Sequence, residues 1–533
     1  MKPKKILLLT ILGLMAIAGI YSCQTYYFRN TYKTANELIH NSKNLAEKPF
    51  LKAHMMDGAV NIFSKNWVVD TISNRITGNG EKYDFNRSRI TGGELSVNLD
   101  SVAIFETNKV PVGNGAARIA AISILTVVNV GIGISCLLNP KACFGSCPTF
   151  YLNPDRNFHL ADAEGFSSAI SPSLEYGDVD ALPPISSDST ICITMKNEAL
   201  ETHCLREIAL WSVKKNPGEQ VFHTRKDEFI RCRNRFLPSS AYGPEGDIKT
   251  ALQAPDGRER FSLADAERLD SKEEIFVEFD QTPAQKELGL VVHFRQTLMT
   301  TYFIYSALGY MGNEIGDYLA KLETEPETSK KLENGIWKKL GTIQVFQWNE
   351  TGKTWELAGS LYETGPIAIN KQLVPLNSKT TGNRIRLKLL MNKGLWRIDH
   401  LALTQIVGKE EPVKIKPFHV RKQGKTDPSL LEKINDPDKL LISMPGNEFE
   451  FRFEADDPKS DHDYFLYSKG YYLEWMRENW LSNKNLTLLQ RMLVNPELYL
   501  AEVAADYKEY EKTMEKQFWD SRIDTKTFVH HAP

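Results

Sequence analysis

Arg384 to Ile406, RIRLKLLMNKGLWRIDHLALTQI, is the stretch that decides the fold class. Apolar and polar residues alternate through RIRLKLLM and again through WRIDHLALTQI, which is the pattern of half-buried β-strands. The same pattern occurs upstream in GTIQVFQW, TWELAGSL and IAINKQLVPL, with regular turns between the segments. Residues 340–406 therefore predict an antiparallel β-sandwich.

Neighbouring segments extend this sandwich to residues 273–456. IFVEF and LGLVVHF precede it as strands, and residues 297–322 carry apolar side chains mostly three and four positions apart, which predicts an inserted helix. The segment EFEFRFEA, Glu448 to Ala455, alternates cleanly and is expected to return to the same sheet as an edge strand. The Lys- and Pro-rich residues 408–437 indicate a linker or surface excursion.

The rest of the chain adds two further β units and a helical end. Residues 53–110 hold short strand-like runs separated by Gly, Asn and Asp, which predicts a small domain resembling an SH3 or OB barrel. Residues 141–272 predict a cysteine-containing β domain. Tyr464 to Trp519 has a helical pattern, with Pro496 near a helix start, so residues 457–533 form the predicted helical C-terminal region. The expected fold class is mainly β with helices, a multidomain α+β protein.

Length and charge restrict the classes of function. A chain of 533 residues is expected to form three or four domains. Its 42% apolar and 25% charged residues are globular composition. The formal net charge is −2, and it becomes −5 without Lys2, Lys4 and Lys5. This balance gives no electrostatic reason to expect a nucleic-acid partner.

The N-terminus has the strongest targeting signal. Three lysines precede an uncharged apolar run from Ile6 to Ile20, which is followed by Tyr21-Ser22-Cys23. This leader resembles the lipobox signal peptide of bacterial lipoproteins, although Tyr21 departs from the usual residue type. The resemblance implies that residues 1–22 are removed and that Cys23 is diacylated on its thiol and acylated again on its amine, with residues 23–52 as a tether. Several acyl chains anchor a protein stably. The alternative is an uncleaved signal anchor with an incidental cysteine.

Residues 111–140 contain a second hydrophobic segment. Ile119 to Leu138 is uncharged and is long enough to span a bilayer. Ser123, Thr126 and Asn129 lower its hydropathy, which favours a helix buried in the fold or lying on the membrane surface. Both interpretations, burial and a transmembrane span, remain open from the sequence.

Six cysteines remain after Cys23, and all lie within residues 136–232. They are Cys136, Cys143, Cys147, Cys192, Cys204 and Cys232. An even number in an exported chain predicts disulfides, with fifteen connectivities open. Cys192 and Cys204 are expected on neighbouring strands, where a cross-strand bridge needs Cα atoms within about 7 Å.

The segment from Cys143 to Pro148, CFGSCP, is a candidate metal or redox motif. Its CxxxCP spacing is similar to that of Sco-type copper chaperones, which bind copper through two thiolates and a distant histidine. Thiolates suit Cu(I), and His159, His203 and His223 are available as a third ligand. The resemblance stops at the motif, because a strand-like TFYL follows and no βαβ unit is visible. Structural disulfides are the alternative for Cys143 and Cys147.

Tryptophans in the predicted sandwich are the other candidate ligand residues. Trp348, Trp355 and Trp396 would stack against sugars if exposed, in a fold loosely similar to galactose-binding-like jelly rolls, whereas core packing is the alternative. No phosphate-binding glycine loop, HExxH motif or catalytic Ser/His/Asp order is present, so no cofactor and no catalytic residue are assigned. We expect a lipid-anchored protein of the bacterial cell envelope, facing the periplasm or the surface. Its expected role is non-enzymatic binding or scaffolding for an envelope protein or glycan, and the alternative is an envelope thiol or copper protein.

Overall fold

The computed structural model describes most of the chain between Phe28 and Lys526. The described residues are 28–32, 38–39, 51–55, 59–64, 66–83, 89–109, 147–153, 160–167, 169, 175–185, 190–199, 201–224, 226, 228–280, 286–311, 339–362, 365–377, 384–455, 460–474, 484–520 and 522–526. The leader, Cys23, the segment Ile119 to Leu138, Cys136 and Cys143 lie outside these residues. Among the described helices, none has the length and apolar character that crossing a membrane requires.

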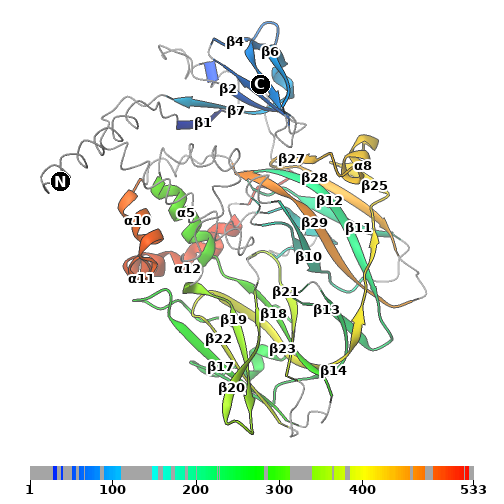
Figure 1. The fold of residues 1–533 in the computed structure, drawn as a ribbon, viewed down its shortest axis with the longest axis vertical. Coiled ribbons are helices and arrows are strands. Elements are labelled where there is room, and N and C mark those ends of the chain that lie inside the picture. The colour runs from blue at the N-terminus through cyan, green and yellow to red at the C-terminus, as the bar shows by residue number, and fades with distance from the viewer. Residues whose placement is uncertain are drawn as a thin grey trace, which may run out of the picture.

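The described chain is mainly β with a helical C-terminal part, which confirms the predicted fold class (Figure 1). A seven-stranded antiparallel sheet forms the N-terminal unit, in the order β1-β7-β2-β3-β5-β4 with β6 paired to β5. Trp67, Phe63 and Ile76 form its apolar core. Its strands are β1 (Phe28–Tyr32), β2 (Leu51–Met55), β3 (Val60–Phe63), β4 (Val68–Asp70), β5 (Arg75–Tyr83), β6 (Arg89–Asn98) and β7 (Val102–Lys109), with a 3-10 turn η1 (Leu99–Ser101) between the last two.

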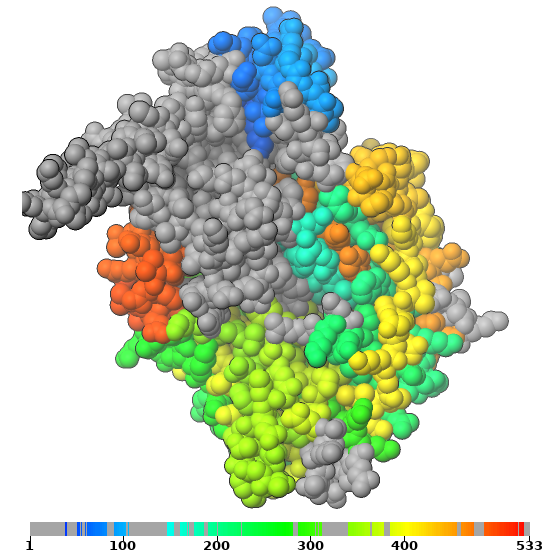
Figure 2. Space-filling view, in the orientation of Figure 1, coloured from blue at the N-terminus to red at the C-terminus, as the bar shows by residue number. Residues whose placement is uncertain are grey.

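Two sheets of the central body join strands that are far apart in the sequence. In the β12 sheet the order is β10-β29-β12-β24, with β27 also paired to β12; in the β11 sheet the order is β26-β25-β28-β11-β8-β9. The first contains β10 (Tyr176–Ala181), β12 (Glu201–Lys214), β24 (Val413–Ile415), β27 (Leu441–Ser443) and β29 (His462–Glu474). The second contains β8 (Thr149–Tyr151), β9 (Ala163–Glu164), β11 (Thr190–Lys196), β25 (His419–Lys422), β26 (Lys425–Thr426) and β28 (Glu448–Glu454). Figure 2 shows the yellow and orange chain of the later strands lying against the cyan and green chain of the earlier ones.

Two sequence predictions need correction in these sheets. The segment EFEFRFEA does form a strand, β28, but it lies between β25 and β11 and is neither an edge strand nor part of the sandwich. The predicted C-terminal helix is wrong at its start, because His462–Glu474 is strand β29, paired along its length with β12. Aromatic residues such as those in FLYSKGYYLE are common in strands, and pairing with the long strand β12 makes this segment a strand and not a helix.

The predicted sandwich consists of a closed five-stranded barrel and a six-stranded sheet. The barrel order is β13-β14-β23-β18-β21, and the second sheet, here called the β17 sheet, has the order β16-β15-β17-β22-β19-β20. The barrel strands are β13 (Glu219–His223), β14 (Phe229–Phe236), β18 (Leu288–Gln296), β21 (Asn370–Pro375) and β23 (Trp396–Glu410). The strands of the β17 sheet are β15 (Ser240–Gly243), β16 (Gly246–Asp247), β17 (Lys272–Phe279), β19 (Ile343–Asn349), β20 (Thr354–Leu361) and β22 (Ile385–Asn392). Residues 141–272 and 273–456, separated as domains from the sequence, thus share the barrel and three sheets.

Helices lie at the edges of these layers. They are α4 (Lys249–Leu252), α5 (Met299–Met311), α8 (Pro428–Asn435), α10 (Leu486–Val494), α11 (Pro496–Glu502) and α12 (Ala504–Asp520). The inserted helix predicted over 297–322 is confirmed as α5 within the described residues. Asn495 caps α11 by accepting from the Leu498 N–H at 3.3 Å, and Pro496 occupies the first turn as predicted.

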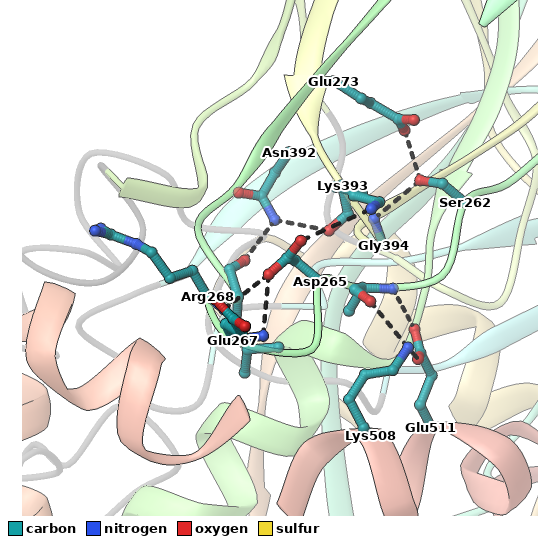
Figure 3. A network of polar contacts seen from close by, with 12 residues as sticks. Ser262, Asp265, Glu267, Arg268, Glu273, Asn392, Lys393, Gly394, Lys508 and Glu511 are labelled. Carbon is teal, nitrogen blue, oxygen red and sulfur yellow. Dashed lines mark hydrogen bonds and ion pairs between the residues drawn. The ribbon is translucent and has the colours of Figure 1, made fainter. Parts of the chain in front are cut away.

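Polar contacts fasten α12 to the loop before β17 (Figure 3). Lys508 Nζ donates to the Ala264 carbonyl at 2.9 Å, and the Ala264 N–H donates to Glu511 Oε1 at 2.7 Å. Ser262 Oγ donates to Glu273 at 2.7 Å and accepts from the Gly394 N–H at 3.3 Å. The rings of Tyr302 on α5 and Tyr507 on α12 meet edge to face at 5.1 Å. The C-terminal helices therefore pack as part of the body.

Candidate functional site

Three titratable side chains lie in one row across the barrel. Strand pairing sets Lys371 of β21 directly opposite His293 of β18, and sets His293 directly opposite His400 of β23. Residues opposite each other on paired strands project from the same face of the sheet. The rings of His293 and His400 lie edge to face with their centroids 5.2 Å apart. His293 follows the apolar run LGLVV of β18, His400 precedes the apolar run LAL of β23, and Lys371 stands between Asn370 and Gln372 on β21.

This row faces the inside of the barrel. Val291, Leu373, Phe222 and Cys232 come from four barrel strands and form one buried apolar cluster. Val291 and Leu373 stand two residues from His293 and Lys371, so they share the same strand face. The opposite face, with residues such as Val292, packs in the main core between the barrel and the β17 sheet. The barrel interior is therefore apolar at one end and titratable at the other.

Two β-bulges bring further polar side chains to this end. On β23 the pairing passes from His400 to Ile398 and skips Asp399. On β14 it passes from Arg233 to Arg235 and skips Asn234, which has a φ of 58°. A bulge adds one unpaired residue and redirects neighbouring side chains, and Asn tolerates the left-handed region better than most residues. Asp399 and Arg235 both line a cavity at this end of the barrel.

A cavity of about 590 Å³ opens at the titratable end of the barrel. Its barrel side carries His293, Lys371, Asp399 and Arg235. The opposite wall comes from the end of β10, the β12–β13 connection and β29, and β10 lies beside β21 (Figure 1). His293 is 4% exposed and Asp399 3%, whereas Arg235 is exposed at the rim. The cavity therefore has a buried titratable floor and a charged rim.

The cavity carboxylates already have partners. Asp463 forms an ion pair with Lys215 at 2.6 Å and accepts from the Val221 N–H at 2.7 Å. Asp162 accepts from the Leu152 N–H at 2.7 Å. Asp399 accepts from the Gly257 N–H at 2.8 Å. These bonds hold the acidic side chains in fixed positions.

Lys371 and Arg235 also line the cavity but, unlike the carboxylates, have no bonded partner among the described residues. Neither the Lys371 ammonium nor the Arg235 guanidinium makes a hydrogen bond or ion pair with another described residue. Lys371 is only partly accessible, and an unpaired cation in such a place is costly unless a ligand or water meets it. The geometry leaves these two donors available to a molecule in the cavity.

Burial shifts the pKa values on the cavity floor. It lowers the pKa of Lys371, and the charges of Asp463, Asp162 and Asp399 oppose this only partly. It also lowers the pKa of His293 well below its usual value, with further contributions from the Lys371, His400 and Arg235 charges. The pKa of Asp399 rises to about 6, mainly through burial, despite the Gly257 hydrogen bond. Perturbed groups gathered in one cavity are typical of functional sites.

Both histidines are neutral at pH 7. Burial and the Arg235 charge lower the pKa of His400 to about 4. His400 Nδ1 lies 3.0 Å from the Leu252 carbonyl oxygen, which only a protonated Nδ1 can satisfy, so the neutral ring carries its proton there. The Nε2 atoms of His293 and His400 are buried with no hydrogen-bond partner among the described residues. The floor next to Lys371 thus holds no additional positive charge.

The predicted disulfides do not form among the described cysteines. Cys147, Cys192, Cys204 and Cys232 are in no disulfide. Cys192 lies on β11, which pairs with β28 and β8, and Cys204 lies on β12, which pairs with β29 and β27. The expectation that Cys192 and Cys204 lie on neighbouring strands is therefore wrong, because strands consecutive in sequence enter different sheets, and the bridge considered between them does not form. The pairing of Cys136 and Cys143 lies outside the described residues.

The environment of Cys147 suits a protonated thiol. Cys147 is buried, and its Sγ donates to Glu164 Oε2 at 3.7 Å. Burial and the Glu164 charge raise the pKa of Cys147 well above its usual value, whereas metal binding requires a thiolate. Of the proposed third ligands, His203 lies beside Glu201 at 3.2 Å and His223 packs on Phe229. The described residues contain no group of three His, Cys, Asp or Glu arranged to hold a metal.

The candidate tryptophans divide between the core and the surface. Trp396 is 1% exposed and packs against Phe294, so it cannot stack on a sugar. Trp348 and Trp355 are direct cross-strand neighbours on β19 and β20 and are half-exposed, with ring centroids 5.3 Å apart. They lie on the outer face of the β17 sheet, where Phe276 is 40% and Tyr242 53% exposed.

Comparison with known proteins does not identify the chain. No protein-family model matches it, and no curated protein matches it significantly. The cavity residues Lys371, His293, His400 and Asp399 were not singled out by sequence reasoning. For the histidines the available signal was a titratable residue next to apolar residues of a predicted strand, in LVVHF and RIDHL; INKQL gave no such signal for Lys371.

Proposed function

We propose that this chain is a lipid-anchored binding protein of the bacterial cell envelope whose barrel cavity holds a small carboxylate ligand. The observation that carries the proposal is the pair of cations, Lys371 and Arg235, that line the cavity without a hydrogen bond or ion pair to another described residue. A ligand carboxylate would supply the missing partner through charge-assisted hydrogen bonds. The three aspartates nearby make their hydrogen bonds to other groups; their charges favour the Lys371 ammonium in part, but none of them bonds to either cation.

The position of the two cations supports a small ligand. Lys371 stands on a barrel strand deep in the cavity, and Arg235 lies at the exposed rim. A volume of about 590 Å³ is in the range of small-molecule sites. One acid group of the ligand would reach Lys371, and the guanidinium at the rim can clamp a carboxylate with two parallel hydrogen bonds.

A binding titration tests this function. We would measure calorimetric binding of lactate, succinate and citrate to the full-length chain in detergent. Lys371→Met and Arg235→Met are each expected to weaken binding at least about tenfold, because each removes a charged hydrogen bond. Lys409→Met removes an exposed lysine that pairs with Glu228 outside the cavity, and should leave binding unchanged. The proposal is refuted if none of the three acids binds, or if Lys409→Met weakens binding as much as the two cavity substitutions do.

The envelope location rests on the leader sequence. Cys23 follows the apolar run at the distance where lipoproteins are cleaved and acylated. Metabolic labelling with a clickable fatty acid, comparing wild type with Cys23→Ala, tests the anchor. We expect the label to disappear and the variant to become extractable with carbonate. Retention of the variant in the membrane would indicate instead that the leader or residues 119–138 span the bilayer.

Glycan binding is a second candidate function, favoured by the outer face of the β17 sheet. Tyr242, Phe276, Lys388, Phe346 and Leu357 stand opposite one another across five strands. Lys388 Nζ lies 5.1 Å from the Phe346 ring centroid, so one charged side chain stands among the rings of this row. Rings beside polar groups are suited to sugar rings, which present apolar faces and hydroxyl edges.

A pull-down with chitin, cellulose and purified peptidoglycan tests the glycan hypothesis. Trp355→Ala is expected to reduce the bound fraction several-fold, since one ring contact is worth about 1 kcal/mol. The matched control is Tyr510→Ala, which removes an aromatic side chain on α12 that is 51% exposed and lies away from this face. If the wild-type chain stays in the supernatant with all three polymers, glycan binding is excluded for them.

A further inference from the structure

We propose that Lys371 forms a covalent imine with 2-oxo acids bound in the barrel cavity. This inference rests on the proposed function and adds a chemical step to it. It would make the site selective for carboxylates that carry a neighbouring carbonyl.

Lys371 differs from the other described lysines whose pKa is lowered. Lys272 has a pKa lowered to about 8, yet its Nζ donates to the Leu340 carbonyl at 2.7 Å and to Asn392 at 3.2 Å. Lys422 also has a lowered pKa, and its Nζ lies over the Phe449 ring. Neither residue lines the cavity. Lys371 combines the lowered pKa with an open cavity and with no bonded partner among the described residues.

A carbonyl needs a neutral amine, and the floor of the cavity favours that form. Burial makes the ammonium less stable than in water, so a larger share of Lys371 is neutral than for an exposed lysine. His293, directly opposite, is held neutral and adds no charge that would stabilise or repel a ligand. The Arg235 guanidinium can hold the ligand carboxylate while the amine reacts.

Asp399 supplies the proton that the reaction requires. The neutral Lys371 Nζ adds to the carbonyl carbon and, after proton transfer from nitrogen to oxygen, gives a carbinolamine. The carboxylic acid form of Asp399 then protonates the carbinolamine hydroxyl, which leaves as water. The nitrogen lone pair forms the C=N bond, leaving a protonated imine and the Asp399 carboxylate. With its pKa near 6, Asp399 is available in both forms near neutral pH.

Reductive trapping tests the inference. The full-length chain is incubated with pyruvate or with lactate, treated with borohydride, and digested for peptide mass mapping. We expect a reduced pyruvate adduct on the Lys371 peptide, about tenfold above those of Lys272 and Lys422, and none with lactate. Lys371→Arg, which keeps a cation, should abolish the adduct, and Asp399→Asn should slow its formation by about a hundredfold. Thermal melts of both variants show that they are folded.

The results of these experiments distinguish a failure of the imine from a failure of the proposed carboxylate-binding function. If pyruvate and lactate both bind but borohydride traps nothing, the imine is refuted and the binding function stands. If adducts spread evenly over Lys272, Lys371 and Lys422, the reaction is general amine reactivity and the inference fails. If pyruvate, lactate, succinate and citrate all fail to bind in calorimetry, the proposed function fails together with the inference.

Discussion

Asp399→Asn is expected to stabilise the folded chain at neutral pH. Asp399 is 3% exposed on the cavity floor, and the Asn side chain has the same shape and can keep the bond from the Gly257 N–H at 2.8 Å. The substitution therefore removes the ionisation of this side chain and little else. Its effect on stability should depend on pH in a way that a packing change would not.

The sign and size follow from the pKa of Asp399. This pKa is raised from 3.8 to about 6, so the folded state binds the proton more tightly than the unfolded chain does. The carboxyl group thus contributes stability that is fully present below about pH 4 and is lost as the pH rises through about 6. A tenfold difference in proton affinity corresponds to about 1.4 kcal/mol, so ionisation costs the folded state on the order of 3 kcal/mol at pH 7.

Urea unfolding between pH 4 and pH 8, followed by tryptophan fluorescence, measures the effect. We expect the variant and the wild type to unfold at similar urea concentrations at pH 4. The variant should become more stable by on the order of 3 kcal/mol as the pH reaches 7. If the difference between the two proteins is the same at every pH, the pKa of Asp399 is not raised and the proton-donor role above loses its basis.

Asp265→Asn is the matched control for this measurement. The Asp265 carboxylate accepts from the Glu267 and Arg268 N–H groups at 3.0 Å, and these bonds lower its pKa. The stability that it contributes is therefore present above its unfolded pKa and is lost as the pH falls. The control should destabilise the protein at pH 7 and have little effect in acid, which is the opposite pH dependence to that of Asp399→Asn.

Three other substitutions test structural conclusions by urea unfolding or thermal melting. Arg260→Met should cost about 3–5 kcal/mol, because it leaves Glu273, which is 3% exposed, as a buried charge without its guanidinium; a cost below 1 kcal/mol would contradict the buried pair. Cys192→Ser should change stability by less than about 1 kcal/mol, since no disulfide is lost; a loss of about 2–4 kcal/mol would indicate a bridge after all. Trp396→Ala should cost about 3–5 kcal/mol through the cavity that it creates, and an unchanged melt would place this ring outside the core.

The sequence predicted where most strands and helices lie better than it predicted which strands pair. Alternation located the strands around Trp396 and the turns between them, because one buried face imposes a period of two. Alternation did not separate the barrel from the β17 sheet, because it indicates which residues are buried and not which strands pair. The sequence pattern also predicted a helix where strand β29 forms, because pairing with β12 selects the strand. Cys192 and Cys204 were expected on neighbouring strands, where a bridge was possible, whereas the chain crosses between sheets after β11.

The candidate site depended on information that is absent from local patterns. Lys371, His293 and His400 come together through the register of three strands that are separated in sequence by two long connections. Asp399 joins them through a bulge, and a bulge shifts by one residue the face that alternation assigns. The predicted aromatic candidates Trp348 and Trp355 were brought together, because a short hairpin fixes their register locally.

The pairing of β28 with β11 and of β29 with β12 has a consequence for how the protein is made. Thr190 is paired with Glu454, and Glu201 with Glu474, so these sheets join parts of the chain that are synthesised far apart in time. Closing such long loops costs entropy before any contact is gained, and non-local pairing folds slowly. Until the last strands arrive, β11 and β12 present open hydrogen-bonding edges, which are templates for aggregation. A chain cut before Leu441 would keep those edges permanently, so truncation at the C-terminal side is expected to abolish soluble expression rather than yield a smaller folded domain.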